Sequence, residues 1–438
     1  MCHIIMTQPL TGPFVVISRP PYDPAFRLLE LLLCFALLIL CLPLWGLHFL
    51  YALFSRRQWL MREHVLGAGG RVITLLRTRP LGSRFFDHPM ISESPRLWFI
   101  PLGHLSLVGP APVPPEWANQ VESRYLERLR VRPGLVNTHF VRSRVNIAFA
   151  DEAELALEDA NSLGFKKKVA LLLRSIPALV LGSKENAQAT EDAVTLFGLS
   201  MANRSRDEAV AEVLELARDP KPTRIAFVNP ACINIAMKDS AYSNILLNSD
   251  LVYPDGIGIQ LACKLTGKNL RDNLNGTDLY PALADKMAET GQGFFLFGGR
   301  PGVCEAMIQK TLERLPQLRF CGHQHGYYKP EEEEKIVAQI NNSGADVLLV
   351  AMGVPQQEKL IDRLLPQLNV GMVMGVGGLF DFYSGRMPRA PLWMREIGME
   401  WSYRLIMEPR RMWRRYLIGN LVFLWHLFRK HHLKGDQK

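Results

Sequence analysis

The longest uncharged run in the chain places the strongest constraint on what it can fold into. From Leu31 to Phe54 there are 24 residues without one Asp, Glu, Lys or Arg. A helix needs about 20 apolar residues to cross a bilayer, so this run is long enough for a membrane helix. It starts well inside the chain and lacks a small-residue cleavage site, which argues against a removable signal peptide. A buried core helix is the alternative.

Pro43 lies in the middle of this run. Proline removes a backbone donor and clashes with the preceding turn, so we expect a kink at this residue. Two arrangements remain open: a tilted full span, and a helix that bends at Pro43 and re-enters the leaflet from which it came. Arg56 and Arg57 follow the run, which favours a cytoplasmic location for the rest of the chain.

Composition excludes several classes of protein. A length of 438 residues allows two or three domains. A hydrophobic content of 48% and a charged content of 21% exclude a disordered chain. None of the seven cysteines forms a C-x-x-C pair, so we expect neither a disulfide scaffold nor a zinc site.

The net charge of +9 is concentrated at the C-terminus. From Arg386 onward there are twelve Lys or Arg and four Asp or Glu, a local excess of eight. Such a surplus suits phosphate groups, either of a nucleotide or of an anionic membrane surface. The apolar stretch 416–428 is too short to cross a bilayer and instead favours a helix lying in the headgroup region. A solvated charged helix is the alternative.

From Arg224 onward, short apolar runs alternate with amphipathic stretches. The runs read RIAFVNP, SDLVYPDG, GFFLFGGRPG, LRFCGHQHG, ADVLLVAMGVP and VGMVMGVGGLF. Continuous apolar strands separated by helices predict a parallel sheet covered on both faces, that is, an α/β, Rossmann-like fold. Binding sites in such sheets lie at the carboxyl ends of the strands.

Two motifs follow predicted strands. Phe297–Gly302 (FGGRPG) ends one strand and precedes a helix that opens at Val303, an arrangement that favours a nucleotide diphosphate, although its glycines could also serve a tight turn. Asp255, in the peptide PDGIG, places a carboxylate at a strand end, where it could act as a general base or cap the next helix. No Asp-x-Asp pair occurs to hold a metal against a diphosphate. We therefore expect no metal and no cofactor, and assign the diphosphate's charge to C-terminal arginines.

The part from Leu28 to Gly182 resembles the monotopic bacterial phosphoglycosyl transferases, which start polyprenyl-linked glycan synthesis. The resemblance rests on the proline-broken anchor, on LSLVGP ending at Pro110 and on RPG ending at Gly134. It implies an Asp-Glu dyad whose aspartate attacks a sugar nucleotide, but this chain has Ser92-Glu93 at that place. A serine without an adjacent base is a poor nucleophile, so we expect this domain to be a catalytically inactive, degenerate anchor.

The part from Val194 to Tyr416 closely resembles the WecG/TagA/CpsF family, glycosyltransferase family twenty-six. The matching motifs are PDGIG, GTD, FGG, GVPQQE, GGLFDFYSGRMPRAPLWM and GMEWSYRLIMEPRRMWRRY. The resemblance implies inverting, metal-independent transfer of a hexosyl unit from a UDP-sugar to a polyprenyl-diphosphate-linked saccharide. It makes Asp255 the catalytic base and Gln357 a donor contact. The other residues expected to bind substrate are Asn229, Thr277, Asp278, Gly298, Gly299, Glu358, Asp381, Arg389, Arg404, Arg411, Arg414 and Arg415.

Together these patterns predict four segments. They are a membrane-anchored domain at 24–183 with its apolar helix at 28–54, a linker and first helix at 184–222, a transferase domain at 194–416, and a basic amphipathic membrane-associating C-terminus at 396–438. We expect an enzyme of bacterial exopolysaccharide, capsule or cell-wall polymer synthesis at the cytoplasmic face of the inner membrane. Its partners would be the donor, the lipid-linked acceptor and the lipid surface, with no nucleic acid and with a homo-oligomer possible. The alternatives are a bifunctional protein whose first domain also transfers a phosphosugar to polyprenyl phosphate, and a non-catalytic scaffold.

Overall fold

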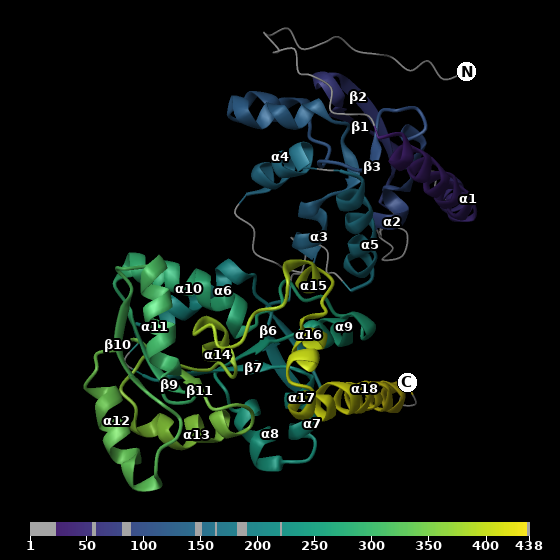
Figure 1. Cartoon of the computed structure of the whole chain (residues 1–438). Helices are drawn as coiled ribbons and strands as arrows, with labels where there is room; N and C mark the ends of the chain where they lie inside the picture. Colours follow the sequence, from purple (N-terminus) through teal and green to yellow (C-terminus); the bar gives the residue numbers. More distant parts are fainter. Residues whose placement is uncertain are drawn as a thin grey trace. The chain divides into compact units, whose positions relative to one another are not determined.

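A computed structural model describes residues 23–54, 58–80, 89–144, 151–162, 164–181, 191–219 and 221–435. The chain divides into two compact units, Met1–Gly182 and Ser183–Lys438, which we treat one at a time (Figure 1). Arg56 and Arg57, which favour a cytoplasmic location, lie outside the described residues, as do residues 184–190 of the expected linker.

The apolar run forms one helix, α1 (Pro24–Phe54), with Pro43 inside it. Asp23 caps its first turn by accepting a hydrogen bond from the Phe26 amide at 3.0 Å. One side of α1 is buried along nearly its full length at spacings of three or four residues: Phe26, Glu30, Cys34, Leu38, Cys41, Trp45, His48 and Ala52. The remaining surface of the helix is apolar and exposed. By length and composition α1 is the one candidate for a membrane span among the described residues.

Polar contacts fix α1 onto the rest of the first unit. Arg27 donates to the carbonyl of Ile100 at 2.7 Å, and the Trp45 indole donates to the Ser94 hydroxyl, also at 2.7 Å. The Glu30 carboxylate accepts from the amide of Leu107 at 2.6 Å. The elements around α1 are β1 (Leu60–Leu66), β2 (Val72–Thr78), α2 (Pro89–Ser92), the 3₁₀ helix η2 (Ser94–Phe99), β3 (Ser106–Val108), β4 (Gly134–Val136), α3 (Thr138–Arg144), α4 (Glu152–Ser162) and α5 (Phe165–Leu181).

The second unit contains the predicted parallel sheet. Each of the six apolar runs contains a strand: β7 (Thr223–Val228), β8 (Leu251–Pro254), β9 (Gly293–Gly298), β10 (Arg319–Gln324), β11 (Val347–Ala351) and β12 (Met372–Gly375). Their order across the sheet is β10-β9-β11-β12-β7-β8, and every neighbouring pair is parallel. The carboxyl ends of all six strands therefore meet at one edge.

Helices cover both faces of this sheet (Figure 1). Alternate strand residues point to opposite faces, so Phe294 and Leu296 join one core cluster while Phe295 and Phe297 join another. The first face packs against α6 (Arg206–Leu216), α10 (Gly276–Thr290), α11 (Val303–Arg314) and α14 (Leu379–Tyr383). The opposite face packs against α7 (Pro230–Ala236), α8 (Ser240–Leu247), α9 (Ile257–Leu265), α12 (Glu333–Asn341) and α13 (Gln356–Leu364).

The segment expected as a linker has more structure than its sequence predicts. Besides the expected helix, which here is α6, it contains a hairpin of β5 (Ala193–Leu196) and β6 (Leu199–Ala202). Val194 and Met201 of this hairpin are fully buried in the same cluster as α7, α8 and α9. The described part of this segment, 191–219, therefore belongs to the second unit.

The C-terminal segment folds as a series of short helices and one longer helix. They are α15 (Leu392–Glu396), α16 (Glu400–Met407), α17 (Pro409–Trp413), the π-helix η7 (Arg414–Ile418) and α18 (Gly419–Gly435). Phe423 and Leu427 of α18 are buried in the core of the second unit, while Leu421 and Trp425 are exposed. The helix expected in the headgroup region thus has one face inside the protein and an apolar face outside it.

Candidate active site

Polar side chains and glycine turns gather at the carboxyl edge of the parallel sheet. Asn229 follows β7, Asp255 follows β8, and the glycines of the FGG motif end β9. Gly353 follows β11, and Gly377 follows β12. Because these five strands are adjacent in the sheet, the motifs predicted from sequence come together at its carboxyl edge. We call this part of the edge, from the end of β9 to the end of β8, the mouth.

Asp255 is joined to the neighbouring strand by a hydrogen bond. The Asn229 Nδ2 donates to the Asp255 Oδ2 at 3.1 Å, while the Asn229 Oδ1 caps α7 by accepting from the amides of Ala231 and Cys232. The cap residue of α9 is Gly256, and no side chain caps that helix. The alternative function of Asp255 as a helix cap is therefore excluded. Among the described residues, Asn229 binds one of its two carboxylate oxygens.

The surroundings of Asp255 suit a general base. Burial raises the pKa of its carboxyl above the usual value, and the side chain of Asp278 raises it further. The hydrogen bond from Asn229 and the positive charges of Arg415 and Arg404 act in the opposite direction. A carboxylate that is made more basic by burial, yet held near two guanidinium groups, can accept a proton from a hydroxyl.

Gln357 lies beneath the mouth and does not face open space. Its Oε1 accepts from the amides of Gly353 at 3.2 Å and Gly377 at 3.0 Å, and its Nε2 donates to the Glu358 Oε1 at 2.7 Å. Only 2% of the residue is exposed. A side chain at Gly375 would come within 2.8 Å of this amide. In this structure Gln357 joins the loops after β11 and β12, and the donor contact expected from sequence stays a prediction.

The GTD motif fastens the C-terminal segment to the mouth. Asn275 caps α10 and donates to the Asp278 Oδ2 at 2.7 Å, while Arg389 pairs with the Asp278 Oδ1 at 2.8 Å. Arg389 also pairs with Glu400 of α16 at 3.3 Å. The Thr277 carbonyl accepts from the Tyr383 hydroxyl at 2.8 Å. Both oxygens of Asp278 therefore have partners, and the motif holds α10 against the segment that follows β12.

The four arginines predicted to close over a diphosphate separate into two pairs. Arg404 stacks over the Phe382 ring at 5.2 Å and lies against Gly378. Within the described part of the chain, the buried Nε atoms of Arg404 and Arg415 have no hydrogen-bond partner. Arg411 is 65% exposed and pairs with Glu408.

Arg414 is also exposed and stacks on the neighbouring Trp413 at 5.3 Å. The positive charges of Arg404 and Arg415 thus act on Asp255, whereas Arg411 and Arg414 face solvent.

The remaining predicted residues, Gly298, Gly299 and Asp381, make contacts within the protein. Gly298 has a φ of 136°, and a side chain there would collide with the carbonyl of Ala351. The Gly299 amide donates to that same carbonyl at 2.9 Å. The tight-turn interpretation accounts for both glycines, because their conformation and contacts come from the turn itself. Asp381 pairs with Arg386 at 3.0 Å.

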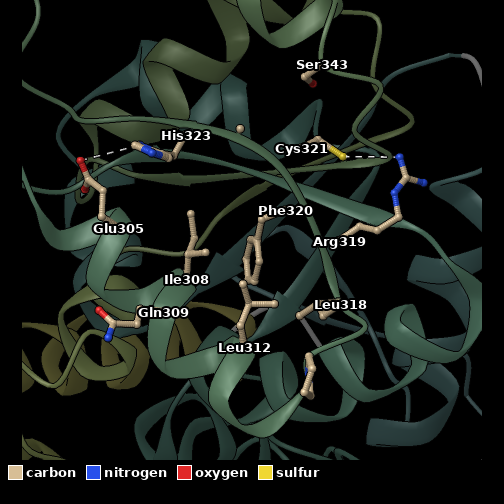
Figure 2. Close-up of a pocket in the computed structure, with 12 residues that line it drawn as sticks. Glu305, Ile308, Gln309, Leu312, Leu318, Arg319, Phe320, Cys321, His323 and Ser343 are labelled. Atoms are coloured by element: carbon tan, nitrogen blue, oxygen red, sulfur yellow. Dashed lines mark hydrogen bonds and ion pairs between the residues drawn. The ribbon is translucent and has the colours of Figure 1, made fainter.

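A groove on the outer edge of the sheet contains none of these residues. It lies between α11 and the edge strand β10, where Glu305 approaches His323 and Arg319 approaches Cys321, each at 3.9 Å (Figure 2). Among the residues that the structure describes, no three His, Cys, Asp or Glu side chains gather in a way that could hold a metal ion.

The first unit has a different arrangement at the position of the expected dyad. Ser92 ends α2, and the adjacent Glu93 pairs with Arg96 at 3.3 Å. Arg96 is nearly buried and also pairs with Glu63 of β1 at 2.6 Å. The only acid next to Ser92 in sequence therefore takes part in an ion-pair network that ties β1 to η2.

Comparison with known proteins identifies the second unit. Residues 194–437 match the glycosyl transferase WecG/TagA/CpsF family, which covers more than half of the chain. The chain belongs to this family of glycosyltransferases. The resemblance predicted from the PDGIG, GTD and GVPQQE motifs is confirmed, and Asp255, Asp278 and Gln357 all lie inside the matched region.

Two bacterial relatives share the transferase part. An N-acetylglucosaminyldiphosphoundecaprenol N-acetyl-beta-D-mannosaminyltransferase of Bacillus subtilis (strain 168) is 33% identical over 193 residues, which cover 44% of this chain and 74% of the relative. A protein of the same name from Bacillus spizizenii (strain ATCC 23059 / NRRL B-14472 / W23) is 34% identical over 193 residues, with the same coverage. Residues 80–182 match the bacterial sugar transferase family, which confirms the resemblance described above for the part from Leu28 to Gly182.

Sequence reasoning missed several residues that shape the mouth. Asn275 could have been found, because an asparagine directly before a helix, three residues ahead of an acid, is typical of a helix cap. Glu400 and Phe382 gave no such signal. Their importance comes from contacts with Arg389 and Arg404, which exist only because the C-terminal segment folds back over the sheet.

Proposed function

We propose that the second unit transfers a hexosyl unit, with inversion and without a metal ion, from a UDP-sugar to a polyprenyl-diphosphate-linked saccharide. The observation that carries this proposal is the mouth itself. Asp255 lies at the strand ends under the influence of the positive charges of Arg404 and Arg415, and each of these arginines has a buried Nε with no hydrogen-bond partner among the described residues. The activity named for the two Bacillus relatives, transfer to an N-acetylglucosaminyldiphosphoundecaprenol, supports the acceptor class.

The proposed reaction uses these residues in one displacement. Asp255 accepts the proton of the acceptor hydroxyl as that oxygen forms a bond to the anomeric carbon of the donor. The bond from the anomeric carbon to the diphosphate breaks on the opposite side, and its electron pair leaves with UDP. Arg404 and Arg415 neutralise the charge that develops on the leaving diphosphate.

We further propose that the first unit anchors the enzyme and does not transfer a phosphosugar. Glu93 forms an ion pair with Arg96, so Ser92 has no adjacent base to activate its hydroxyl. The exposed apolar surface of α1 and the outer face of α18 would lie against the inner membrane, on the cytoplasmic side where nucleotide sugars are made. This location brings the mouth to the lipid-linked acceptor of an exopolysaccharide, capsule or cell-wall polymer pathway.

Mass spectrometry of the lipid product tests the transfer. The full-length protein is incubated with a panel of UDP-sugars and a polyprenyl-diphosphate-linked saccharide in the presence of a chelator. We expect the acceptor to gain one hexosyl mass with one member of the panel. No product with any donor, or product only after a divalent metal is restored, would contradict the proposed chemistry.

A further inference from the structure

Glu400 opens the short helix that carries Arg404, one of the two arginines assigned to the diphosphate. α16 begins at Glu400, and Arg404 follows one turn later on the same helix. The N-cap residue, Met399, gives the first turn no side-chain hydrogen bond. Residues four apart on a helix lie on the same face. A contact that fixes the Glu400 carboxylate therefore also fixes the face of α16 from which Arg404 extends.

An ion-pair bridge joins Glu400 to the mouth. The Arg389 Nη2 lies 3.3 Å from the Glu400 Oε1 and 2.8 Å from the Asp278 Oδ1. Asp278 is itself fixed, because the Asn275 Nδ2 donates to its Oδ2 at 2.7 Å and its own amide donates to the Asn275 Oδ1 at 2.9 Å. The three charged side chains are between 22% and 32% exposed, so solvent screens the bridge less than it screens a pair on the open surface. One guanidinium thus connects the start of α10 to the first turn of α16.

Phe382 of α14 lies between this bridge and Arg404. The guanidinium carbons of Arg389 and Arg404 lie 5.8 Å and 5.2 Å from the centre of its ring, and both distances suit a cation–π contact. A Cβ at Gly378 would come within 2.7 Å of the Arg404 Nη2, so this guanidinium lies directly against the turn that follows β12. The position of Arg404 at the mouth is therefore set by Phe382, by Gly378 and by the helix that Glu400 opens.

We propose that Glu400 is a positioning residue, whose carboxylate acts through Arg389 to hold α16 with the Arg404 guanidinium toward the donor diphosphate. The inference rests on the proposed function, from which it takes the contact between Arg404 and the leaving diphosphate. Glu400 and the diphosphate are both negatively charged, so a direct contact between them would be repulsive. The effect of Glu400 on the reaction therefore passes through Arg404.

Glu400→Ala removes the carboxylate and leaves Arg389 paired with Asp278. UDP affinity by calorimetry, and kcat and KM for donor and acceptor, are measured with the full-length protein at pH 8. Burial raises the pKa of Glu400 and the charge of Arg389 lowers it, and pH 8 keeps the carboxyl ionised. We expect UDP affinity and donor kcat/KM to fall about tenfold, while acceptor KM changes less than about twofold. An acceptor KM that rises as much as the donor KM would overturn the proposal.

Two further variants calibrate this result. Glu400→Gln should lose less than Glu400→Ala, because its amide oxygen can still accept a hydrogen bond from Arg389 without the added strength of a charge. Glu334→Ala is the matched control, since it makes the same change at an exposed position in the first turn of α12, and it should match the wild type. Thermal unfolding midpoints show whether each variant keeps its fold. Should Glu400→Ala lower the midpoint, Glu400→Gln makes the same comparison with the size of the side chain kept.

An Arg404→Ala background separates positioning from a purely structural function. Because Glu400 acts through Arg404, Glu400→Ala should reduce donor kcat/KM no further in that background. A structural function would add the same loss in both backgrounds. That result would overturn the proposal, as would wild-type kinetics of Glu400→Ala alone. Absence of UDP binding by the wild type, or full activity of Arg404→Ala, would instead reject the proposed function.

Discussion

Replacing Asp255 by asparagine removes the proposed base and leaves its surroundings almost unchanged. The amide is the same size as the carboxyl, and its oxygen can still accept the hydrogen bond from Asn229 that the structure has at 3.1 Å. Gly256, not Asp255, caps α9, so no helix cap is lost. The substitution therefore tests the chemistry of the carboxylate separately from the fold.

The expected loss in kcat lies toward the upper end of the range for a general base. Such groups contribute about 10²- to 10⁴-fold, or about 2.7 to 5.4 kcal/mol of barrier. Two other carboxylates at the mouth already have partners within the protein. Asp278 pairs with Arg389 and Asn275, and Glu358 is buried against Gln357. We therefore expect a loss of about 10³- to 10⁴-fold.

Stability should change in the opposite direction from activity. Burial raises the pKa of Asp255 in the folded state, so its protonated form favours folding and that contribution is lost as the pH rises through the raised value. At neutral pH the wild type therefore bears the cost of an ionised buried carboxyl, which asparagine avoids. Asp255→Asn should unfold at the same temperature as the wild type at pH 7, or at a higher one. This advantage should disappear below about pH 4, where the aspartate is protonated in both folded and unfolded states.

Steady-state transfer kinetics and differential scanning calorimetry make the two measurements. Asp207→Asn is the matched control, because its side chain is 91% exposed at the start of α6 and takes no part in the proposed chemistry. Asp207→Asn should keep wild-type kcat. Near-normal turnover of Asp255→Asn would refute the base assignment, and a marked loss of its thermal stability at pH 7 would refute the electrostatic reasoning.

Three further predictions concern the other parts of the chain. Arg415→Ala should lower kcat about 10²- to 10³-fold without rescue by magnesium, while Arg411→Ala should change it less than about twofold; equal losses would contradict the division of the arginines. The wild-type protein should form no phosphosugar adduct detectable by mass spectrometry after incubation with UDP-sugars, because Ser92 has no adjacent base; an adduct on residues 89–98 would show a working first unit. Leu421→Glu combined with Trp425→Glu should weaken sedimentation with anionic vesicles yet spare turnover on a short soluble acceptor; unchanged sedimentation would exclude this face of α18 from lipid contact.

The strands and their functional ends could be predicted from sequence, because a parallel strand buried on both faces reads as a continuous apolar run. Each of the six runs contains a strand, and the residues that follow these strands lie at the same edge of the sheet, as expected. The β5–β6 hairpin was missed because its strands are four residues long and polar sequence surrounds them. Its burial depends on tertiary contacts of Val194 and Met201 that no local pattern reveals.

Side-chain functions were harder to predict than side-chain positions. Asp278 and Gln357 belong to motifs that sequence reasoning found, but the partner of Asp278, Arg389, lies far away in the chain. Gln357 accepts from the amide of Gly353, 4 residues before it, and from that of Gly377, 20 residues after it, and no local pattern predicts that it joins these two loops. Arg404 and Arg415 differ in exposure from Arg411 and Arg414 because the C-terminal segment is not one regular helix. A break before Pro409 and the π-helix η7 (Arg414–Ile418) change the helical phase that a uniform spacing would predict.

The nucleotide released during turnover tests the central claim most directly. Full-length protein is incubated with its UDP-sugar and the polyprenyl-diphosphate-linked acceptor, and UDP and UMP are quantified together with the elongated lipid. Glycosyl transfer by the Asp255 mouth predicts one UDP for each lipid elongated, no UMP, and loss of both products in Asp255→Asn. Release of UMP, or product formation that persists in Asp255→Asn, would place the chemistry elsewhere in the chain and contradict the account.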